Sequence, residues 1–401
     1  MVYDVAAVRS RFPALNSGVA YFDTPGGSQV PDVVAGAIAD ALLAGLSNRG
    51  RVSASERAAD DVVVRARAAM ADLLGADPGG IVFGRSMTQL TYDVARTIAK
   101  TWRPGDEVVV TRLDHDANIR PWVQAAGAVG ARVRWADFDP VSGELTTRDI
   151  DSQLSDRTRL VAVTGASNLI GTRPPLADIA RLVHARGALY YVDGVHLTAH
   201  EPIDIQAIGA DLFVCSPYKF LGPHCGVLAA RPALLADLEP DKLLPSTNEG
   251  PEKFELGTLP YELLAGTASA VDFIATLSDD GVTGRRDRLR SAMRAVSVHE
   301  AQLRVLLEGA LAALPGVVRY SRATDRTPTL LLTIDGRDSA EASRYLADLR
   351  VNAPAGSFYA LEASRRLGLG AAGGLRVGLA PYSNSEDVGR LIDGLRRFIG
   401  S

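Results

Sequence analysis

The stretch Ser216-Pro217-Tyr218-Lys219-Phe220-Leu221-Gly222-Pro223 directly follows the apolar run DLFVCS (211–216). An apolar run of this length is typical of a buried strand, and the Gly-Pro pair predicts a turn. A lysine between a strand end and a turn lies in a confined, partly dry pocket, where its pKa falls and its amine becomes a nucleophile and a base. Arginine stays protonated and cannot replace it. The structural alternative is a surface lysine in a loop.

Upstream and downstream of this stretch, short apolar runs alternate with helical patterns, including one helix from Thr88 to about Lys100. The runs cover residues 81–84, 107–112, 131–138, 159–165, 188–194, 211–216 and 226–231. They predict an α/β fold with a mostly parallel, seven-stranded sheet whose strands are buried on both faces.

After residue 265 the pattern changes to a long helical stretch (266–312), apolar runs at 327–336 and 374–380, and a helix at 338–349. This pattern predicts a smaller α+β domain. The predicted division is an N-terminal segment (1–20) that packs on the small domain, a large domain (21–265) and a small C-terminal domain (266–401).

Two more predicted strands end in polar residues. Asp193, in YYVDGVH, closes a run that should be buried, and a buried carboxylate needs a cationic partner. Asn168, in TGASNLIGT, follows another strand. Ligands of open α/β sheets bind just past such carboxyl ends. A lysine, a carboxylate and an amide at one edge resemble a pyridoxal 5′-phosphate (PLP) site, which needs a lysine for the aldehyde and a carboxylate for the ring nitrogen.

Over nearly its whole length the chain resembles the class V aminotransferases of PLP fold type I, closest to the cysteine desulfurase and selenocysteine lyase branch. Eight motifs carry the resemblance in order: YFDTPGGSQVP, FGRSMTQLTYDVA, LDHDANIRPW, SNLIGT, VDGVH, SPYKFLGP, FELGT and RVGLAPYSNSEDV. The resemblance implies a homodimer that uses PLP and acts on a small-molecule amino acid.

The resemblance also implies a role for each matching residue. Lys219 would hold the cofactor aldehyde, Asp193 the ring nitrogen, and His196, in place of the usual glutamine, the phenolic oxygen. The remaining matches are Asn168 near that oxygen and the substrate, Thr88 and Ser216 at the phosphate, Thr258 at the phosphate of the partner subunit, and Arg376 at the substrate carboxylate. The structural alternatives are a helix cap for Thr88, a turn residue for Ser216, a satisfied buried histidine for His196 and a structural ion pair for Arg376.

The sequence departs from the family at three places. Tyr359, in the segment 353–363, occupies the place of the desulfurases' catalytic cysteine, and no cysteine follows Cys225. In LDHDANI, the position of the ring-stacking histidine carries Asp116, with His115 one place earlier; either His115 moves into the stacking role or the ring is covered differently, and the acid could transfer protons. Tyr218 replaces a histidine, and its hydroxyl could still reach the phosphate.

These departures favour a PLP-dependent C–S lyase that acts on cysteine or an S-substituted cysteine by β-elimination, without a persulfide cysteine. The alternatives within the enzymes are transamination, epimerisation and decarboxylation-coupled oxidative deamination to an aldehyde, since the fold does not select among them. A non-catalytic PLP-fold binding protein is the alternative outside the enzymes.

Composition excludes several other classes. The 401 residues include 43 basic and 47 acidic side chains, a balance that gives no footprint for nucleic acid or an anionic membrane. Two cysteines exclude a disulfide framework, and six scattered histidines show no metal-ligand spacing. The N-terminus lacks the features of a secretion signal, so we expect a cytoplasmic protein.

Overall fold

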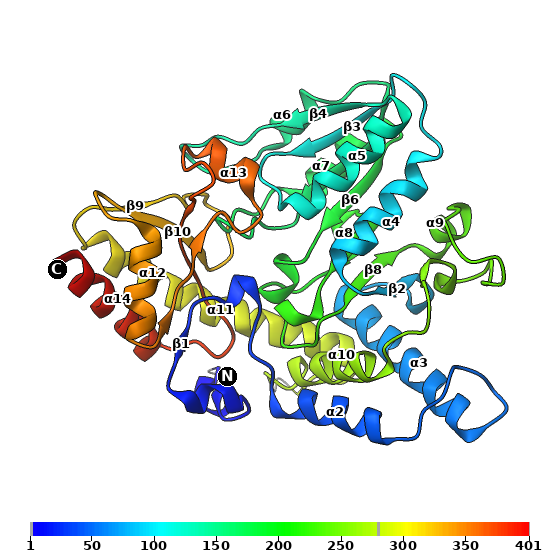
Figure 1. Cartoon of the computed structure of the whole chain (residues 1–401), viewed down its shortest axis with the longest axis horizontal. Coiled ribbons are helices and arrows are strands. Elements are labelled where there is room, and N and C mark those ends of the chain that lie inside the picture. Colours follow the sequence, from blue (N-terminus) through cyan, green and yellow to red (C-terminus); the bar gives the residue numbers. More distant parts are fainter. Residues whose placement is uncertain (1–2, 279–280, 401) are drawn as a thin grey trace.

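The structure, a computed structural model, describes residues 3–278 and 281–400. Its main sheet has seven strands in the order β2-β8-β7-β6-β5-β3-β4 (Figure 1). The strands are β2 (Ile81–Gly84), β3 (Glu107–Thr111), β4 (Arg132–Ala136), β5 (Thr158–Thr164), β6 (Leu189–Asp193), β7 (Leu212–Cys215) and β8 (Gly226–Ala230). Every neighbouring pair from β7 to β4 is parallel, and β8 runs antiparallel to β7 and β2. The predicted mostly parallel sheet is confirmed.

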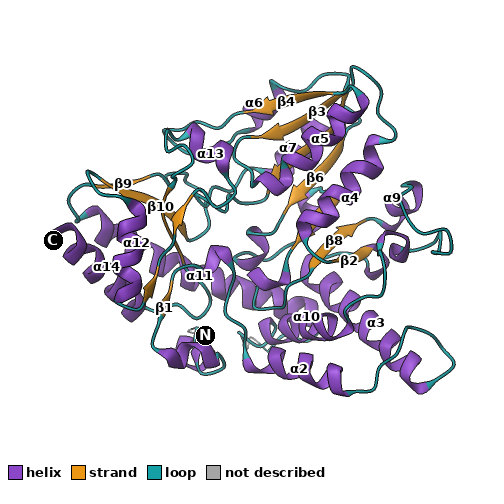
Figure 2. Cartoon of the chain, in the orientation of Figure 1, coloured by secondary structure: helices purple, strands orange, loops and turns teal. Residues whose placement is uncertain are grey.

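Helices cover both faces of this sheet (Figure 2). Val109 and Val161 belong to the hydrophobic core on one face, whereas Val108 and Val110 belong to the core on the other. The first core includes α3 (Ala54–Leu74), α7 (Leu176–Ala185), α8 (Ile205–Ile208), α10 (Tyr261–Ile274) and the start of α11 (Arg285–Ala312). The second includes α4 (Met87–Ala99), α5 (Arg120–Val129) and α9 (Pro232–Asp237). Burial on both faces explains why the strand sequences are apolar without alternation.

A second, antiparallel sheet lies in the C-terminal part of the chain, at the left of Figure 1. Its order is β12 (Ala355–Gly356), β13 (Gly374–Gly378), β10 (Thr329–Ile334) and β9 (Val317–Arg319). The end of α11, α12 (Ser339–Asp348) and α14 (Ser385–Gly400) bury their apolar side chains against it. This arrangement confirms the predicted α+β part of the fold class.

The predicted helix over 266–312 is instead two helices, α10 and α11. Helix α10 starts before residue 265 and packs on α2 (Asp32–Leu43) and α3. The N-terminal segment, with α1 (Val5–Arg9), contacts both parts of the chain: Arg9 pairs with Asp387 at 2.7 Å, and the rings of Phe12 and Phe273 lie 5.7 Å apart. The predicted domain boundaries therefore stay a prediction.

The remaining short elements connect these layers. They are β1 (Ala20–Tyr21), which pairs in parallel with β11 (Val351–Asn352), and the helices α6 (Thr147–Asp151) and α13 (Leu361–Arg366). Among the described residues, no helix is long and apolar enough to span a bilayer. Because β3, β5, β6 and β7 are parallel, their carboxyl ends lie at one edge of the sheet, where a ligand site is expected.

Candidate active site

A cavity of about 690 Å³ opens at this edge of the sheet. It receives side chains from the ends of the parallel strands, from the start of α4 and from the C-terminal part of the chain. The predicted site residues that line it are Thr88, His115, Asp116, Asn168, Asp193, His196, Tyr218, Lys219, Tyr359 and Arg376. Ser216 and Thr258 are not among the lining residues. The fold thus gathers residues that lie up to 288 positions apart in the sequence, from Thr88 to Arg376.

Lys219 ends a short 3-10 helix (Pro217–Lys219) that follows β7. The turn after it is tight, because the Gly222 N–H donates to the Pro217 carbonyl at 2.9 Å and Leu221 adopts a φ of 69°. The Leu221 N–H donates to Ser28 Oγ at 2.8 Å, which holds this unusual conformation for a residue with a side chain. The Lys219 ammonium donates to the carbonyl of Pro25.

The environment of Lys219 lowers the pKa of its amine to about 7, because the side chain is buried and the positive charge of Arg376 lies nearby. Asp193 acts in the opposite direction and raises the pKa of Lys219. Burial in turn raises the pKa of Asp193 to about 6, although Lys219 and a hydrogen bond from the Val195 N–H at 2.9 Å favour its charged form. The cavity therefore holds a nucleophilic amine beside a buried acid.

The turn that follows Asp193 requires a glycine. A Cβ at Gly194 would lie 1.9 Å from the ring of Phe213, so no side chain fits there. The turn places His196 in the cavity wall, where its Nε2 lies 2.9 Å from Thr329 Oγ1 and 3.0 Å from Thr327 Oγ1. Burial lowers the pKa of His196 well below its usual value, so the ring is neutral.

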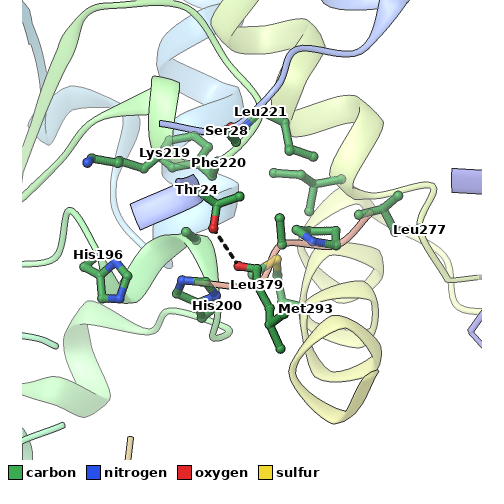
Figure 3. A pocket seen from close by; sticks show the side chains of 14 residues that line it. Thr24, Ser28, His196, His200, Lys219, Phe220, Leu221, Leu277, Met293 and Leu379 are labelled. Atoms are coloured by element: carbon green, nitrogen blue, oxygen red, sulfur yellow. Dashed lines mark hydrogen bonds between the residues drawn. The ribbon is translucent and has the colours of Figure 1, made fainter. Parts of the chain in front are cut away.

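Behind Lys219 the packing is nearly complete (Figure 3). A pocket of about 10 Å³, which has room for one water molecule at most, lies between Lys219 on one side and Leu277 and Met293 on the other. Thr24 closes this side with a 3.0 Å hydrogen bond to the carbonyl of Leu379. Figure 3 shows the Lys219 amine pointing away from Leu277 and Met293. The apolar packing supports the lysine stem and leaves the amine to the large cavity.

Arg376, in β13, also lines the cavity. Its Nη1 donates to the main-chain carbonyl of Asn168 at 3.0 Å, and its guanidinium carbon lies 3.6 Å from the centre of the Phe358 ring. Burial lowers the pKa of Arg376 to about 9, and Asp23 opposes this shift. Arg376 Nε and Asn168 Oδ1 are buried without a hydrogen-bond partner within the described residues. These atoms are available to a polar ligand.

The side chains of His115 and Asp116 make different contacts. His115 Nδ1 accepts a hydrogen bond from the Ala117 N–H at 3.0 Å, and burial lowers its pKa to about 4, so a neutral ring carries its proton on Nε2. Its ring lies against Tyr359, with centroids 5.6 Å apart. Asp116 instead pairs with Arg120 at 2.8 Å. Both residues line the cavity, but only the Asp116 side chain is engaged in an ion pair within the described part of the chain.

The predicted phosphate residues are spread over three segments. Thr88 lies in the first turn of α4, whose free N–H groups favour an anion. Tyr218 lines the cavity with its ring stacked on His224, at 4.7 Å between centroids. Ser216 is buried before Lys219, and Thr258 is exposed on the loop that precedes α10. Only Thr88 and Tyr218 of these four face the cavity.

Sequence reasoning missed several lining residues. Tyr92 follows Thr88 by one helical turn, and Arg120 follows Asp116 by one turn, so helical spacing alone could have indicated both. Phe358, whose ring contacts the Arg376 guanidinium, could not be predicted as a lining residue from local sequence patterns. Its position depends on packing between distant parts of the chain. Asp23 faces Arg376 from the segment after β1, and its Oδ1 is another buried atom without a partner among the described residues.

The residues fit PLP. The cavity offers an amine of lowered pKa for an aldehyde, a buried carboxylate for a ring nitrogen, and a helix N-terminus for a phosphate. The unpartnered Arg376 Nε and Asn168 Oδ1 add a place for a polar amino-acid substrate. No group of side chains suited to a metal ion occurs in residues 3–278 and 281–400.

Comparison with known proteins agrees with this geometry. The model of the family "Aminotransferase class-V" matches residues 20–391. "Uncharacterized protein MT3887" of Mycobacterium tuberculosis is 34% identical over 98% of this chain and 99% of its own length. A cysteine desulfurase of Klebsiella pneumoniae is 30% identical, over 99% of this chain and 98% of its own.

Among solved structures, the cysteine desulfurase CsdA from Escherichia coli has a TM-score of 0.87 and 26% identity, covering 99% of this chain and 98% of its own. Members of this family use PLP, and they are enzymes. The chain therefore belongs to the class V aminotransferase family and is a PLP-dependent, cysteine desulfurase-like enzyme.

Proposed function

We propose that this enzyme is a C–S lyase that cleaves cysteine or an S-substituted cysteine by β-elimination and releases the thiol directly. The observation that carries this proposal is the loop with Tyr359 at the cavity mouth. A tyrosine cannot accept sulfur as a persulfide, and the side chain is 76% exposed where a sulfur carrier would be needed.

The loop is fixed at both sides. The Tyr359 carbonyl accepts a hydrogen bond from the Asp116 N–H at 2.7 Å, and the Phe358 carbonyl accepts one from Asn168 Nδ2 at 3.0 Å. Phe358 and Tyr359 have φ values of 51° and 58°, which side chains rarely adopt and which persist only where surrounding contacts hold them. This supports a fixed wall of the cavity rather than a carrier that must travel to an acceptor.

The two cysteines offer no substitute. Cys215 and Cys225 are both buried, and burial raises the pKa of each thiol, that of Cys225 to about 11. Cys225 Sγ lies 3.4 Å from Thr267 Oγ1, within hydrogen-bond distance. The thiolate is the reactive form of cysteine, so neither residue is suited to take up sulfur.

The proposed chemistry needs few groups. Bound PLP would supply an electron sink for the charge left at Cα. Lys219 Nζ, with a pKa near neutrality, would take the proton from Cα, and Asp193 would pair with the ring nitrogen and favour its protonated form. Arg376 binds the substrate carboxylate beside Asn168. The C–S bond then breaks, sulfur leaves as a thiolate, and water converts the remaining fragment into pyruvate and ammonia.

The other residues serve in binding. We propose that Thr88 and the N-terminus of α4, with Tyr218, hold the phosphate. His196 would contact the phenolic oxygen as a neutral ring, and His115 would cover the cofactor face.

Product analysis tests the reaction. The enzyme is incubated with cysteine and a series of S-substituted cysteines, and products are identified by mass spectrometry. Equal amounts of thiol, pyruvate and ammonia support the proposal. A keto acid that retains sulfur, an inverted Cα centre, or an aldehyde with carbon dioxide would each assign a different PLP reaction. Lys219→Ala is the matched inactive control.

We also propose a homodimer with shared sites. Thr258 is exposed and is not among the residues that line the cavity of its own chain. Exposed leucines occur on α2 and on the segment before Thr258: Leu43 is 85% exposed and Leu244 98%. A second copy would cover such apolar surface. Lys219→Ala subunits mixed with Thr258→Ala subunits form hybrids with one undamaged site, so recovered activity supports sharing. A fully active monomer in sedimentation would contradict it.

A further inference from the structure

We propose that Glu255 is a positioning residue that couples the phosphate side of its own cavity to the loop lent to the neighbouring subunit. This inference rests on the proposed homodimer and on the role of Thr258 in it. It goes further by assigning one buried carboxylate to both sites of the dimer.

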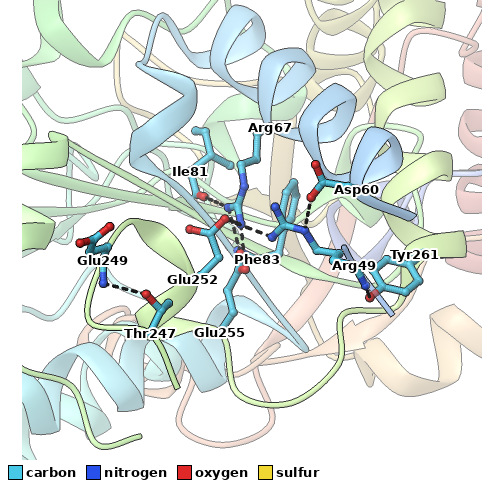
Figure 4. Close-up of polar contacts among 10 residues, drawn as sticks. All are labelled: Arg49, Asp60, Arg67, Ile81, Phe83, Thr247, Glu249, Glu252, Glu255 and Tyr261. Carbon is cyan, nitrogen blue, oxygen red and sulfur yellow. Dashed lines mark hydrogen bonds and ion pairs between the residues drawn. The ribbon is translucent and has the colours of Figure 1, made fainter. Parts of the chain in front are cut away.

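Glu255 follows the short 3-10 helix η7 (Pro251–Phe254), and its side chain is 3% exposed. Arg67 of α3 donates two hydrogen bonds to it, from Nη1 to Oε1 at 3.0 Å and from Nη2 to Oε2 at 2.8 Å. Figure 4 shows this two-pronged pair at the centre of a wider group of charged side chains. Two parallel charge-assisted bonds fix orientation as well as distance.

The pair is attached to an edge strand of the main sheet. Glu255 Oε1 accepts a hydrogen bond from the main-chain N–H of Phe83 at 2.9 Å, and Arg67 donates to the carbonyl of Ile81 (Figure 4). Both residues lie in β2, an edge strand that pairs only with β8 among the described strands. Side chains thus satisfy main-chain groups on the unpaired side of the strand.

From β2 the chain leads directly to the phosphate side of the cavity. β2 ends at Gly84, and α4 begins three residues later at Met87. Thr88 lies in the first turn of that helix and lines the cavity. A shift of β2 would therefore carry the N-terminus of α4 with it.

On its other side, Glu255 anchors the loop that ends at Thr258. Leu256, Gly257 and Thr258 are exposed, and Gly257 has a φ of 84°, so the chain turns outward immediately after the buried carboxylate. Only Leu256 and Gly257 separate Glu255 from Thr258. Without the anchor, the loop would lose the attachment that sets the position of Thr258.

Neighbouring charges support the pair from the solvent side. Glu252 lies 3.2 Å from Arg67 and 3.1 Å from Arg49, and Arg49 pairs with Asp60 at 2.8 Å. The Glu252 side chain is 35% exposed and pairs with Arg49 and Arg67, and within the described residues it makes no hydrogen bond to β2. Glu252 thus provides a matched control: it shares the loop and the ion-pair network but lacks the contact with β2.

Hybrid dimers test the inference, because only one subunit keeps Lys219. The reference pairs a wild-type subunit with a Lys219→Ala subunit. One test hybrid places Glu255→Gln on the Lys219→Ala subunit, and the other places it on the subunit with Lys219. The readout is the amount of PLP that borohydride fixes on Lys219 as PLP concentration rises, with sedimentation confirming the dimer.

We expect the PLP affinity at Lys219 to fall about tenfold in both hybrids, the effect of losing one charge-assisted hydrogen bond. Glu252→Gln on either subunit should leave the PLP affinity within about twofold of that of the reference hybrid. If Glu255→Gln on the Lys219→Ala subunit leaves the PLP affinity equal to that of the reference hybrid, the link to the partner's site is wrong. If Glu255→Gln on the subunit with Lys219 leaves it equal, the link through β2 is wrong. Either result ends the coupling.

Two further variants distinguish a folding defect of Glu255→Gln from an incorrect dimer arrangement. If Glu255→Gln does not fold because Arg67 is left uncompensated, Arg67→Gln combined with Glu255→Gln removes both charges and should give the same pattern. Thr258→Ala on the Lys219→Ala subunit tests the shared site itself. Reference affinity there, or a monomer in sedimentation, shows that the proposed dimer arrangement is wrong and overturns the coupling with it. None of these readouts depends on C–S cleavage.

Discussion

Lys219 and Asp193 share one buried cavity, and each shifts the pKa of the other toward the charged form. Burial acts against both charges and is the larger effect, so the amine has a pKa of about 7 and the carboxyl one of about 6. The pair is therefore poised between charged and neutral forms near neutral pH. A cationic ring nitrogen beside Asp193 would hold that carboxylate charged.

Borohydride reduction of the enzyme with PLP should fix the cofactor on Lys219. The other lysines are engaged elsewhere: Lys100 pairs with Asp241 at 2.7 Å, Lys242 donates to Ser246, and Lys253 donates to Ala236. Peptide mapping by mass spectrometry checks the position. In the Lys219→Ala variant the fixed adduct should be absent; an adduct on one of the other three lysines would refute the assignment.

Covalent loading with PLP should depend on pH through Lys219. Only the unprotonated amine attacks an aldehyde, so the loading rate should rise with pH, reach half its maximum at about 7, and level off above pH 8. Besides Asp193, the charged or titratable groups near this amine include Arg376, His115, His196 and Tyr218, whose ring centre lies 5.0 Å from Nζ. The lowered pKa values of both histidines and the raised pKa of Tyr218 keep these three groups neutral in this range. Stopped-flow absorbance of the apoenzyme measures the rate.

A rate that still rises toward pH 10 would indicate an exposed lysine with an ordinary pKa and would refute the role of Lys219. Arg376→Gln is the informative companion variant. Because the positive charge of Arg376 lowers the pKa of Lys219, its removal should move the midpoint to higher pH.

The sequence predicted those parts of the site that follow strand ends. Lys219, Asp193 and Asn168 each come directly after an apolar run, and parallel strands bring their carboxyl ends to one edge. The contacts of Phe358 with Arg376 and of Glu255 with Phe83 depend on packing between residues far apart in the chain. Periodicity and local motifs contain no information on such pairs.

Helix ends were less accurately predicted. The stretch over 266–312 is rich in Ala and Arg, which favour helix, but it also contains Gly281 and Gly284; α10 ends at Ile274 and α11 begins at Arg285. Gly281 and Gly284 have φ values of 70° and 90°, which a helix does not contain, so the break between the two helices could have been predicted from these glycines.

Arg376 should bind the substrate carboxylate. Arg376→Ala removes a charge-assisted hydrogen-bond donor, so kcat/KM for the amino acid should fall roughly 100-fold, mainly through KM. Arg376→Lys keeps the charge but loses the planar fork and should recover only part of the loss. Steady-state kinetics measure both, and the absorbance of bound PLP serves as control. An unchanged KM in the alanine variant would place the carboxylate elsewhere.

Replacing both cysteines should leave turnover intact. Cys215 and Cys225 are packed in the interior with raised thiol pKa values. Cys215→Ala and Cys225→Ala should therefore each cost only packing, about 1 kcal/mol of unfolding free energy. Denaturant unfolding measures that cost, and the rate of thiol release per folded molecule measures turnover. A persulfide trapped on either cysteine during turnover, or a well-folded double variant that releases no thiol, would show that the enzyme carries sulfur on its own chain and would refute direct release.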